Sequence, residues 1–318
     1  MRVSVLGCGR WGSFIAWYLN HIGHEVTLWG REGSKNLEHL RASRENGILT
    51  FDSKIEITSD LAAAVAHAEV LAISINSQNL RELLARLRGH HRGQPLVLCM
   101  KGIEEGTGLR LSEVAAEVLG PVETAVWVGP GHVQNFVKGV PNCMVIDAND
   151  DGLRRRLVEA FSSDLIRFYY GADLIGNEVG AAAKNVIGIA AGMLDGLGLT
   201  SLKGALISRG PREIARLIRA MGGDELSVYG LSHLGDFEAT VFSAYSHNRR
   251  FGEAFVRGEP YDELAEGVRT TRALLTLGER YEIDLPICRA VSAVVHGGRD
   301  PREILSKLFM RSLKEEFY

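Results

Sequence analysis

The segment Gly7-Cys8-Gly9-Arg10-Trp11-Gly12 predicts the fold of the first half of the chain. It follows a short apolar run, Val3 to Leu6, and opens an amphipathic stretch, which is the context of a dinucleotide-binding turn between a strand and a helix. Gly7 would permit the tight bend, Gly9 would let the backbone approach a pyrophosphate, and Gly12 would let the helix pack closely. The free N–H groups of the helix start would face the anion. The alternative is a glycine turn that binds no ligand.

Short β-branched or apolar runs alternate with helical patterns through the first half of the chain. Strands are predicted at Val3–Leu6, Glu25–Trp29, Val70–Ile75, Leu96–Met100 and Thr124–Val128, with helices at Gly12–Ile22, Leu80–Leu87 and Leu109–Leu119. Such alternation predicts an α/β fold, a Rossmann-type doubly wound parallel sheet with right-handed crossovers.

The second half of the chain changes character after two further strands, predicted at Asn142–Ile146 and Ile166–Tyr170. From there the pattern is helical, with helices expected at Asp173–Leu194, Leu274–Tyr281 and Pro301–Leu313. No repeat or linker composition separates the halves. We therefore expect a dinucleotide-binding domain over residues 1–171 and an all-α substrate domain over residues 172–318, joined directly and packed tightly.

The composition of the 318 residues, 46% hydrophobic and 24% charged, is that of a soluble globular protein. The 36 basic and 39 acidic residues are mixed along the chain and give a net charge of -3, so no nucleic-acid partner or anionic membrane surface is indicated. No apolar run approaches the roughly 18 residues of a membrane span. A small-molecule partner is the better expectation.

The N-terminus lacks the features of a signal peptide, so a cytoplasmic location is expected. The four cysteines, Cys8, Cys99, Cys143 and Cys288, form no C-x-x-C pair and have no histidine at metal spacing. They are predicted to be reduced structural thiols, and no metal site is expected.

The end of the second predicted strand, Trp29-Gly30-Arg31-Glu32, bears on the choice of cofactor. An acidic residue at this place usually binds the ribose hydroxyls of NAD, whereas an arginine can pair with the 2′-phosphate of NADP. Arg31 slightly favours NADPH, and Glu32 in the ribose role would favour NADH.

A lysine among very small residues is the strongest candidate for chemistry. Helical spacing places Lys184 on one face with Asn177, Gly180, Ala181, Gly188 and Ala191, so a ligand could approach closely. Burial would lower the pKa of such a lysine toward the range useful for proton transfer. The alternative is a helix-packing seam in which the lysine reaches water.

Further polar candidates lie at strand ends and between helices. Lys101 follows the strand Leu96–Met100, and Gly129-Pro130-Gly131 follows the next one, both at the carboxyl edge where open α/β sheets bind ligands. The segments Gly230–Thr240 and Ser246–Gly252 bring polar side chains together between helices. Each could also be an ordinary loop or turn.

These motifs together resemble the soluble NAD(P)-dependent glycerol-3-phosphate dehydrogenases, in order and spacing along nearly the whole chain. The resemblance is carried by the glycine-rich segment, Lys101-Gly102, Gly129-Pro130, Lys184-Asn185-Val186, Gly235-Asp236 and Ser246-His247-Asn248-Arg249-Arg250. The match at Ala183–Ile187, Asp195-Gly196-Leu197-Gly198 and Arg209-Gly210 makes it specific.

The resemblance implies reversible reduction of dihydroxyacetone phosphate to sn-glycerol 3-phosphate for glycerophospholipid synthesis, in a cleft between a Rossmann domain and an all-α domain. It implies that Lys184 is the proton donor and acceptor, with Lys101, Asn185 and Asp236 as further catalytic residues. Substrate contacts would come from Gly129, Gly131, Thr240, Ser246, His247, Asn248 and Arg249. Cofactor contacts would come from Gly7, Gly9, Arg10, Trp11, Gly12, Arg31, Lys101, Val133, Leu264 and Glu266. A homodimer is also expected.

The chain departs from the family pattern at the expected phosphate site. His247 stands where the family normally has an arginine that binds the substrate phosphate, and an imidazole is only partly charged near neutral pH. If an imidazolium took over, substrate affinity would weaken as pH rises past its reference pKa of about 6.5, unless Arg249 or Arg250 compensates. Gly131 lacks the side chain common at its position, and Asn76 replaces a common proline near the nicotinamide.

Two other functions compete with the leading one. One is a related dehydrogenase that reduces a different small ketone with the same lysine, because the phosphate-binding part is what departs. The other is a non-catalytic dinucleotide sensor. Retention of Lys101, Lys184, Asn185 and Asp236 argues against the sensor.

Overall fold

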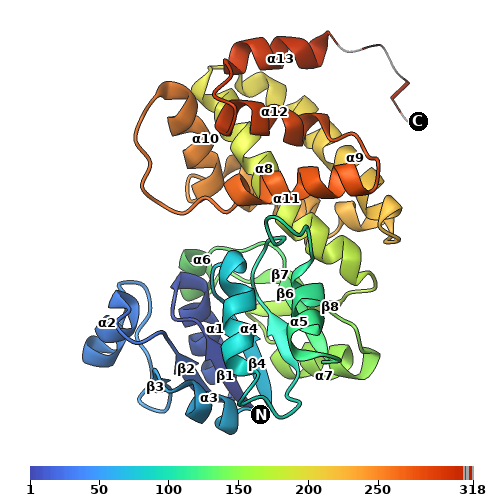
Figure 1. The fold of residues 1–318 in the computed structure, drawn as a ribbon. Coiled ribbons are helices and arrows are strands. Elements are labelled where there is room, and N and C mark those ends of the chain that lie inside the picture. Colours follow the sequence, from blue (N-terminus) through green and yellow to red (C-terminus); the bar gives the residue numbers. More distant parts are fainter. Residues whose placement is uncertain (311, 313–314, 317–318) are drawn as a thin grey trace.

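The computed structural model describes residues 1–310, 312, 315 and 316. A sheet with flanking helices, blue to green in Figure 1, is followed by a set of helices, yellow to red, that lies above it. The strands are β1 (Arg2–Leu6), β2 (Glu25–Trp29), β3 (Glu56–Thr58), β4 (Val70–Ile73), β5 (Leu96–Leu98), β6 (Thr124–Val128), β7 (Asn142–Ala148) and β8 (Ile166–Tyr170). They pair in the order β3-β2-β1-β4-β5-β6-β7-β8.

The sheet is doubly wound, as predicted, but it is not wholly parallel. The chain starts at β1, adds β2 and β3 on one side and then continues from β4 on the other, which makes the crevice after β1 the switch point. The expectation of a parallel sheet is wrong at β7, which pairs antiparallel with β6 and parallel with β8. The reason is the connection over residues 129–141, which holds only the short helix α6 (Val133–Val137) and returns from the same edge of the sheet.

Helices cover both faces of the sheet. They are α1 (Arg10–His21), α2 (Lys35–Ser43), α3 (Leu61–His67), α4 (Leu80–Leu87), α5 (Leu111–Leu119), α6 and α7 (Asp151–Phe161). Alternate residues of one strand enter different apolar clusters: Val97 packs with α1 and α7, whereas Leu96 and Leu98 pack with α4 and α5. Burial on both faces explains the continuous apolar runs that predicted these strands.

Strand β3 and helices α2, α3, α6 and α7 were not predicted from the sequence. Strand β3 has only three residues, Glu56-Ile57-Thr58, and pairs through β2 alone at the edge of the sheet. A segment that short carries no measurable alternation of apolar residues. Its place is set by pairing with β2 rather than by its own composition.

The rest of the described chain is helical, as predicted. The helices are α8 (Leu174–Gly196), α9 (Lys203–Ala220), α10 (His247–Arg257), α11 (Gly267–Arg280), α12 (Pro286–Val295) and α13 (Pro301–Phe309). The last predicted helix extended to Leu313, which lies outside the described residues. None of the helices in the described part of the chain is long and apolar enough to cross a membrane.

Helix α8 packs against α10 with the two backbones in contact. A Cβ atom added at Gly192 of α8 would lie 1.9 Å from the carbonyl oxygen of Arg249, and one added at Gly252 of α10 would lie 2.1 Å from that of Ile189. Only glycine fits at both points. The glycines therefore fix how closely α10 approaches α8.

Three residues, Gly171-Ala172-Asp173, separate β8 from α8, and buried acids tie the two elements into the sheet. Asp147 of β7 accepts hydrogen bonds from the backbone N–H of Asp173 at 2.9 Å and from the amide of Asn177 at 2.8 Å. Glu178 of α8 accepts from Arg110 at 2.6 Å and from the backbone N–H of Ser112 at 2.8 Å, at the start of α5. The first turns of α8 are thus fixed to both β7 and α5.

Replacing Glu178 with alanine should lower the free energy of unfolding by about 3 kcal/mol, because the buried guanidinium of Arg110 loses its buried partner. Glu113 pairs with the same guanidinium from a more exposed position and also accepts from the backbone N–H of Arg110 at the start of α5, so Glu113→Ala should cost less, about 1 kcal/mol. Urea unfolding of both variants measures the difference. Equal losses would contradict a special role for the Glu178 contact.

Candidate active site

Lys184 lies in the middle of α8 and is buried, with 6% of its surface exposed. Its ammonium donates to the hydroxyl of Thr240 at 2.7 Å and lies 2.8 Å from a carboxylate oxygen of Asp236. The alternative of a lysine that reaches water from a packing seam is therefore wrong. Small residues on this face of α8 leave room for the loop over residues 230–240 to approach.

Lys101 brings a second ammonium to the same carboxylate. It follows β5, as predicted for the carboxyl edge of the sheet, and its ammonium lies 2.6 Å from Asp236 Oδ2. The same ammonium donates to the carbonyl of Gly129, which follows β6, at 2.9 Å. Asp236 is only 1% exposed. The edge of the sheet, α8 and the 230–240 loop thus meet at one carboxylate.

This arrangement changes the acidity of Lys184. Burial, the largest cause, and the nearby charge of Lys101 lower the pKa of Lys184, the carboxylate of Asp236 raises it, and the net pKa is about 8. An amine with a pKa near 8 both gives and accepts a proton at physiological pH.

Asparagine side chains extend the site beyond Lys184. Asn185 donates to the carbonyl of Lys101 at 3.5 Å, and its amide oxygen accepts from Asn248 at 3.1 Å. Asn248 in turn accepts from the backbone N–H of Gly267, at the start of α11, at 2.9 Å. Ser246 caps α10 by accepting from the backbone N–H of Arg249. Of the residues predicted to bind substrate, Gly129, Thr240 and Asn248 contact Lys101, Lys184 or Asn185 directly.

Arg249 is not brought to this group. Its guanidinium donates to Asp195 at 2.7 Å and lies 3.5 Å from Glu253. Asp195 lies three turns beyond Lys184 along α8. The predicted role of Arg249 in substrate binding has no support in this geometry, because its charge is matched by two carboxylates elsewhere.

Gly131 has a structural reason to lack a side chain. Its φ angle is 148°, and an added Cβ would lie 2.3 Å from the ring of Phe136. Asn76 has one as well, since its side chain accepts from the backbone N–H of Gln78 at 3.0 Å and caps the short turn over residues 77–79. Proline could not make that bond. Contacts with neighbouring residues thus explain the glycine at position 131 and the asparagine at position 76.

His247 lies between the two halves of the chain. Its Nε2 atom is 3.3 Å from the guanidinium of Arg10, and its Nδ1 atom faces Glu263 and the hydroxyl of Tyr261, the latter at 3.2 Å. Arg250 is also paired with Glu263, at 3.0 Å. The first residue of α1 and the first residue of α10 are therefore in contact.

The glycine-rich segment has the form that the dinucleotide fingerprint requires. Gly7 has a φ angle of 125°, and an added Cβ would lie 2.1 Å from the carbonyl oxygen of Ser74, while one at Gly12 would lie 1.9 Å from that of Gly7. A Cβ at Gly9 would meet nothing among the described residues within 4 Å. The turn is closed by Gly7 and Gly12 and is open to a ligand at Gly9, where α1 begins.

The remaining predicted cofactor residues surround this turn at different depths. Trp11 is half-buried and stacks on Phe14 with the ring centroids 5.1 Å apart, and Val133 at the start of α6 is buried. Leu264 is 56% exposed. Burial raises the pKa of Glu266 to about 7, against the opposing effects of the Ser77 backbone, Lys101 and Lys184.

The strand end that bears on cofactor choice carries an ion pair. Glu32 lies 3.5 Å from Arg41 of α2, and both side chains are exposed. Arg31, also exposed, precedes this pair directly after Gly30. The carboxylate of Glu32 is therefore paired with an arginine.

Two histidines near Lys184 were missed by the sequence analysis. His233 is fully buried, its Nδ1 atom lies 2.8 Å from the carbonyl of Gly180, and burial lowers its pKa to about 4. His132 follows Gly131, and burial lowers its pKa too. The signal for both was position, since each lies in a loop that already held predicted site residues. Among the described residues, no group of histidine, cysteine and acidic side chains could hold a metal ion, and all four cysteines are free.

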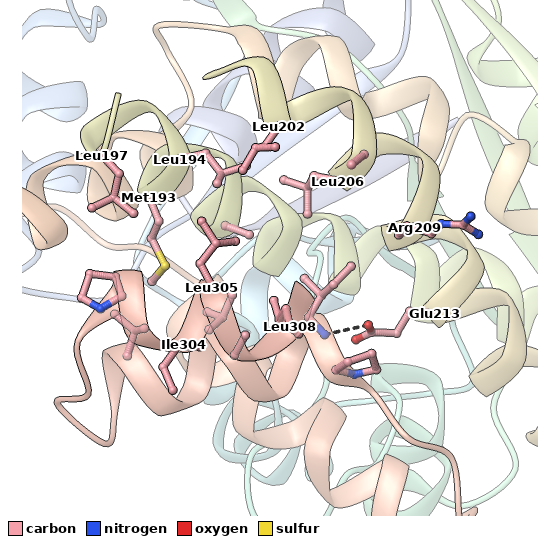
Figure 2. Close-up of a pocket in the computed structure, with 18 of the residues that line it drawn as sticks. Met193, Leu194, Leu197, Leu202, Leu206, Arg209, Glu213, Ile304, Leu305 and Leu308 are labelled. Atoms are coloured by element: carbon pink, nitrogen blue, oxygen red, sulfur yellow. Dashed lines mark hydrogen bonds between the residues drawn. The ribbon is translucent and has the colours of Figure 1, made fainter. Parts of the chain in front are cut away.

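An apolar cavity of about 350 Å³ lies elsewhere, between α8, α9, α12 and α13. Figure 2 shows leucine and isoleucine side chains around it, and a hydrogen bond to the carboxylate of Glu213 on one side. That carboxylate accepts from the backbone N–H groups of Ile287 and Cys288, at the start of α12. None of the predicted site residues lines this cavity.

Comparison with known proteins identifies the family. Residues 2–153 match the N-terminal domain of NAD-dependent glycerol-3-phosphate dehydrogenases, and residues 173–306 match the C-terminal domain. The chain belongs to this family. A glycerol-3-phosphate dehydrogenase [NAD(P)+] of Aromatoleum aromaticum is 35% identical, over 99% of this chain and 100% of that protein. One of Prosthecochloris aestuarii is 37% identical, with the same coverage of both.

A crystal structure of a family member has the same fold. The glycerol-3-phosphate dehydrogenase of Coxiella burnetii superimposes with a TM-score of 0.91 at 29% identity, over 98% of this chain and 99% of that one. A ketopantoate reductase of Ralstonia eutropha, at 16% identity and a TM-score of 0.63, shares the fold alone. The family match spans both the sheet and the helical half.

Replacing Asp236 with alanine should lower the pKa of Lys184 well below about 8, because its ammonium keeps the repulsion of Lys101 and loses the carboxylate that opposes it. Lysine labelling with an amine reagent over a range of pH, read by mass spectrometry, measures the shift. Glu238→Ala removes an exposed acid two residues away and is the control. An unchanged titration of Lys184 in Asp236→Ala would refute the electrostatic account.

Proposed function

We propose that this protein interconverts dihydroxyacetone phosphate and sn-glycerol 3-phosphate by hydride transfer with NAD(P)H. Membership of the glycerol-3-phosphate dehydrogenase family supports the reaction class. The single observation that carries it is the buried ammonium of Lys184, held 2.8 Å from Asp236 beside the carboxyl edge of a dinucleotide-binding sheet.

The glycine-rich turn fits a dinucleotide. The open backbone at Gly9 and the start of α1, which no side chain caps among the described residues, offer N–H groups to a pyrophosphate. When bound, the nicotinamide supplies the hydride. Lys101, at the same edge of the sheet, orients the substrate and holds the common carboxylate.

The chain's own contribution to the chemistry is a proton. Lys184 protonates the carbonyl oxygen of the ketone during reduction and takes the proton back during oxidation, which its pKa of about 8 permits. Thr240 accepts a hydrogen bond from the ammonium and fixes its direction. Asn185 and Asn248 form one wall of the site.

The geometry of the site also bears on the two competing functions, a dinucleotide sensor and a dehydrogenase for another small ketone. A dinucleotide sensor would not require two ammonium groups around the carboxylate of Asp236, which is only 1% exposed. Burying these three charges costs free energy, which favours a catalytic use for them. A related dehydrogenase for another small ketone would keep the lysine and lose recognition of phosphate. Assays with dihydroxyacetone phosphate and with unphosphorylated dihydroxyacetone separate the second function from the proposed one.

We also propose a preference for NADPH over NADH. Arg31 is exposed and can pair with a 2′-phosphate, while Glu32 is already paired with Arg41 and is less available to a ribose. The homodimer, the cytoplasmic location, the supply of glycerophospholipid synthesis and the division at residues 171 and 172 stay predictions.

Replacing Lys184 with alanine should lower kcat by about 10²- to 10⁴-fold while leaving the affinity for cofactor unchanged, since only proton transfer is lost. Lys184→Met keeps the apolar stem in place and should show the same loss. Lys138→Ala, at an exposed lysine, is the control.

The pH profile of the wild type gives an independent readout of the same residue. Reduction needs the protonated amine, so kcat for reduction should fall as pH rises past about 8, and kcat for oxidation should fall as pH drops below it. Near-normal turnover of Lys184→Met would remove Lys184 from the mechanism.

Replacing Arg31 with alanine should reduce the preference for NADPH, because a charge-assisted contact to the 2′-phosphate is lost while NADH has no such group. The affinity for NADPH should fall by about tenfold or more. Fluorescence titration of both cofactors into both proteins measures the ratio. A ratio that stays the same in Arg31→Ala would show that this arginine does not read the 2′-phosphate.

A further inference from the structure

Two helix starts from different halves of the chain meet at one contact. Arg10 is the first residue of α1, His247 is the first residue of α10, and Arg10 Nη1 lies 3.3 Å from His247 Nε2. The starts of helices carry unpaired N–H groups and a partial positive charge, which favours anions. Here the two starts are joined by a guanidinium.

Both ring nitrogens of His247 are already engaged. A guanidinium only donates, and His247 has one beside each ring nitrogen: Arg10 is 3.3 Å from Nε2 and Arg250 is 3.1 Å from Nδ1, so a neutral ring accepts from only one of them. The carboxylate of Glu263, which can only accept, also faces Nδ1, with the hydroxyl of Tyr261 at 3.2 Å, and this favours the ring proton on Nδ1 and acceptance from Arg10 at Nε2. The ring therefore has no N–H left for a ligand, and it is neutral in this arrangement. Burial lowers the pKa of His247, which agrees with a neutral ring.

The neighbouring arginines of α10 are matched by carboxylates. Arg249 is paired with Asp195 and Glu253, and Arg250 is paired with Glu263 and lies over the ring of Tyr261. Arg10 differs from both. It is exposed, and in the described part of the chain it has no ion pair with an acidic side chain. The Arg10 guanidinium therefore has N–H donors available, and its positive charge is not neutralised by an acidic side chain of the described residues.

The Arg10–His247 contact adjoins the Lys184 site along α10. His247 is followed by Asn248, whose amide donates to Asn185, the neighbour of Lys184. The Arg10–His247 contact is therefore one residue along α10 from a side chain of the Lys184 site. A doubly charged phosphate there would meet the guanidinium of Arg10 beside the start of α10, while the backbone N–H groups at the start of α1 serve the pyrophosphate.

We propose that Arg10, and not His247, binds the phosphate of the substrate, and that His247 is the positioning residue that holds the Arg10 guanidinium in place. This inference rests on the proposed reduction of dihydroxyacetone phosphate. The charge that recognises phosphate then comes from the glycine-rich turn rather than from α10. Substrate affinity does not follow the titration of the imidazole.

The test compares variants of the full-length protein. Arg10→Gln should raise KM for dihydroxyacetone phosphate by roughly 10- to 100-fold, the effect of losing a hydrogen bond to a charged group, and by more than it raises the Kd for NADPH. Arg257→Gln removes an arginine at the other end of α10 and is the matched control. Adding His247→Arg to Arg10→Gln should restore most of the lost affinity, since the charge returns from the opposite helix start.

The role of His247 is tested separately. His247→Leu removes the acceptor for Arg10 and should raise KM with kcat retained, whereas His247→Gln keeps an acceptor and should recover part of the affinity. Thermal unfolding of each variant checks that the fold is intact.

Three outcomes overturn the inference. An unchanged KM in Arg10→Gln would show that another group binds the phosphate, and a raised Kd for NADPH with an unchanged KM would assign Arg10 to the cofactor alone. In both cases a wild type that reduces dihydroxyacetone phosphate leaves the proposed function standing. A wild type that cannot reduce it overturns the proposed function and this inference together.

Discussion

The carboxylate of Asp236 is the interaction on which the site depends. Two ammonium groups from distant parts of the chain lie within 2.8 Å of one of its oxygens, in a position that is 1% exposed. Without the carboxylate, two like charges would be close together in a region of low dielectric, which is strongly unfavourable. The loop over residues 230–240 therefore has to close over α8 and β5 before the site exists. The same carboxylate keeps Lys184 protonated enough to serve as an acid.

Much of the fold could be predicted because local pattern and tertiary burial agree. Strands β1, β2, β4, β5 and β6 are buried on both faces, and α8 is a long helix with many small and apolar residues. The sequence pattern of each therefore predicts its secondary structure. Strand β3 and the reversal at β7 could not be found in this way. The first exists through pairing with β2, and the second follows from a connection that never crosses the sheet. Neither leaves a periodic pattern in the chain.

The site was predictable where a residue type and its neighbours both pointed to chemistry. Lys184 among small residues and Lys101 at a strand end are of this kind, and the structure brings both to Asp236. Arg249 could not be judged in this way. Its predicted role came from its place in a motif, but the residue that it pairs with, Asp195, lies three turns beyond Lys184 along α8. The same holds for His247, since its surroundings combine a residue of α1 with one from the loop before α11. Contacts between distant segments decide which charges are free.

The glycine contacts between α8 and α10 act as a fixed spacer for the site. At Gly192 and Gly252 the backbones of α8 and α10 touch, so the axis of α10 has almost no freedom to shift. The cap residue Ser246 and the first-turn residues His247 and Asn248 are therefore held in a fixed position relative to α8. A single extra methyl group at either glycine, far from any ligand, would push that turn outward. The position of the site residues on α10 therefore depends on Gly192 and Gly252, and tolerance to mutation at these two glycines should be far lower than their lack of a side chain suggests.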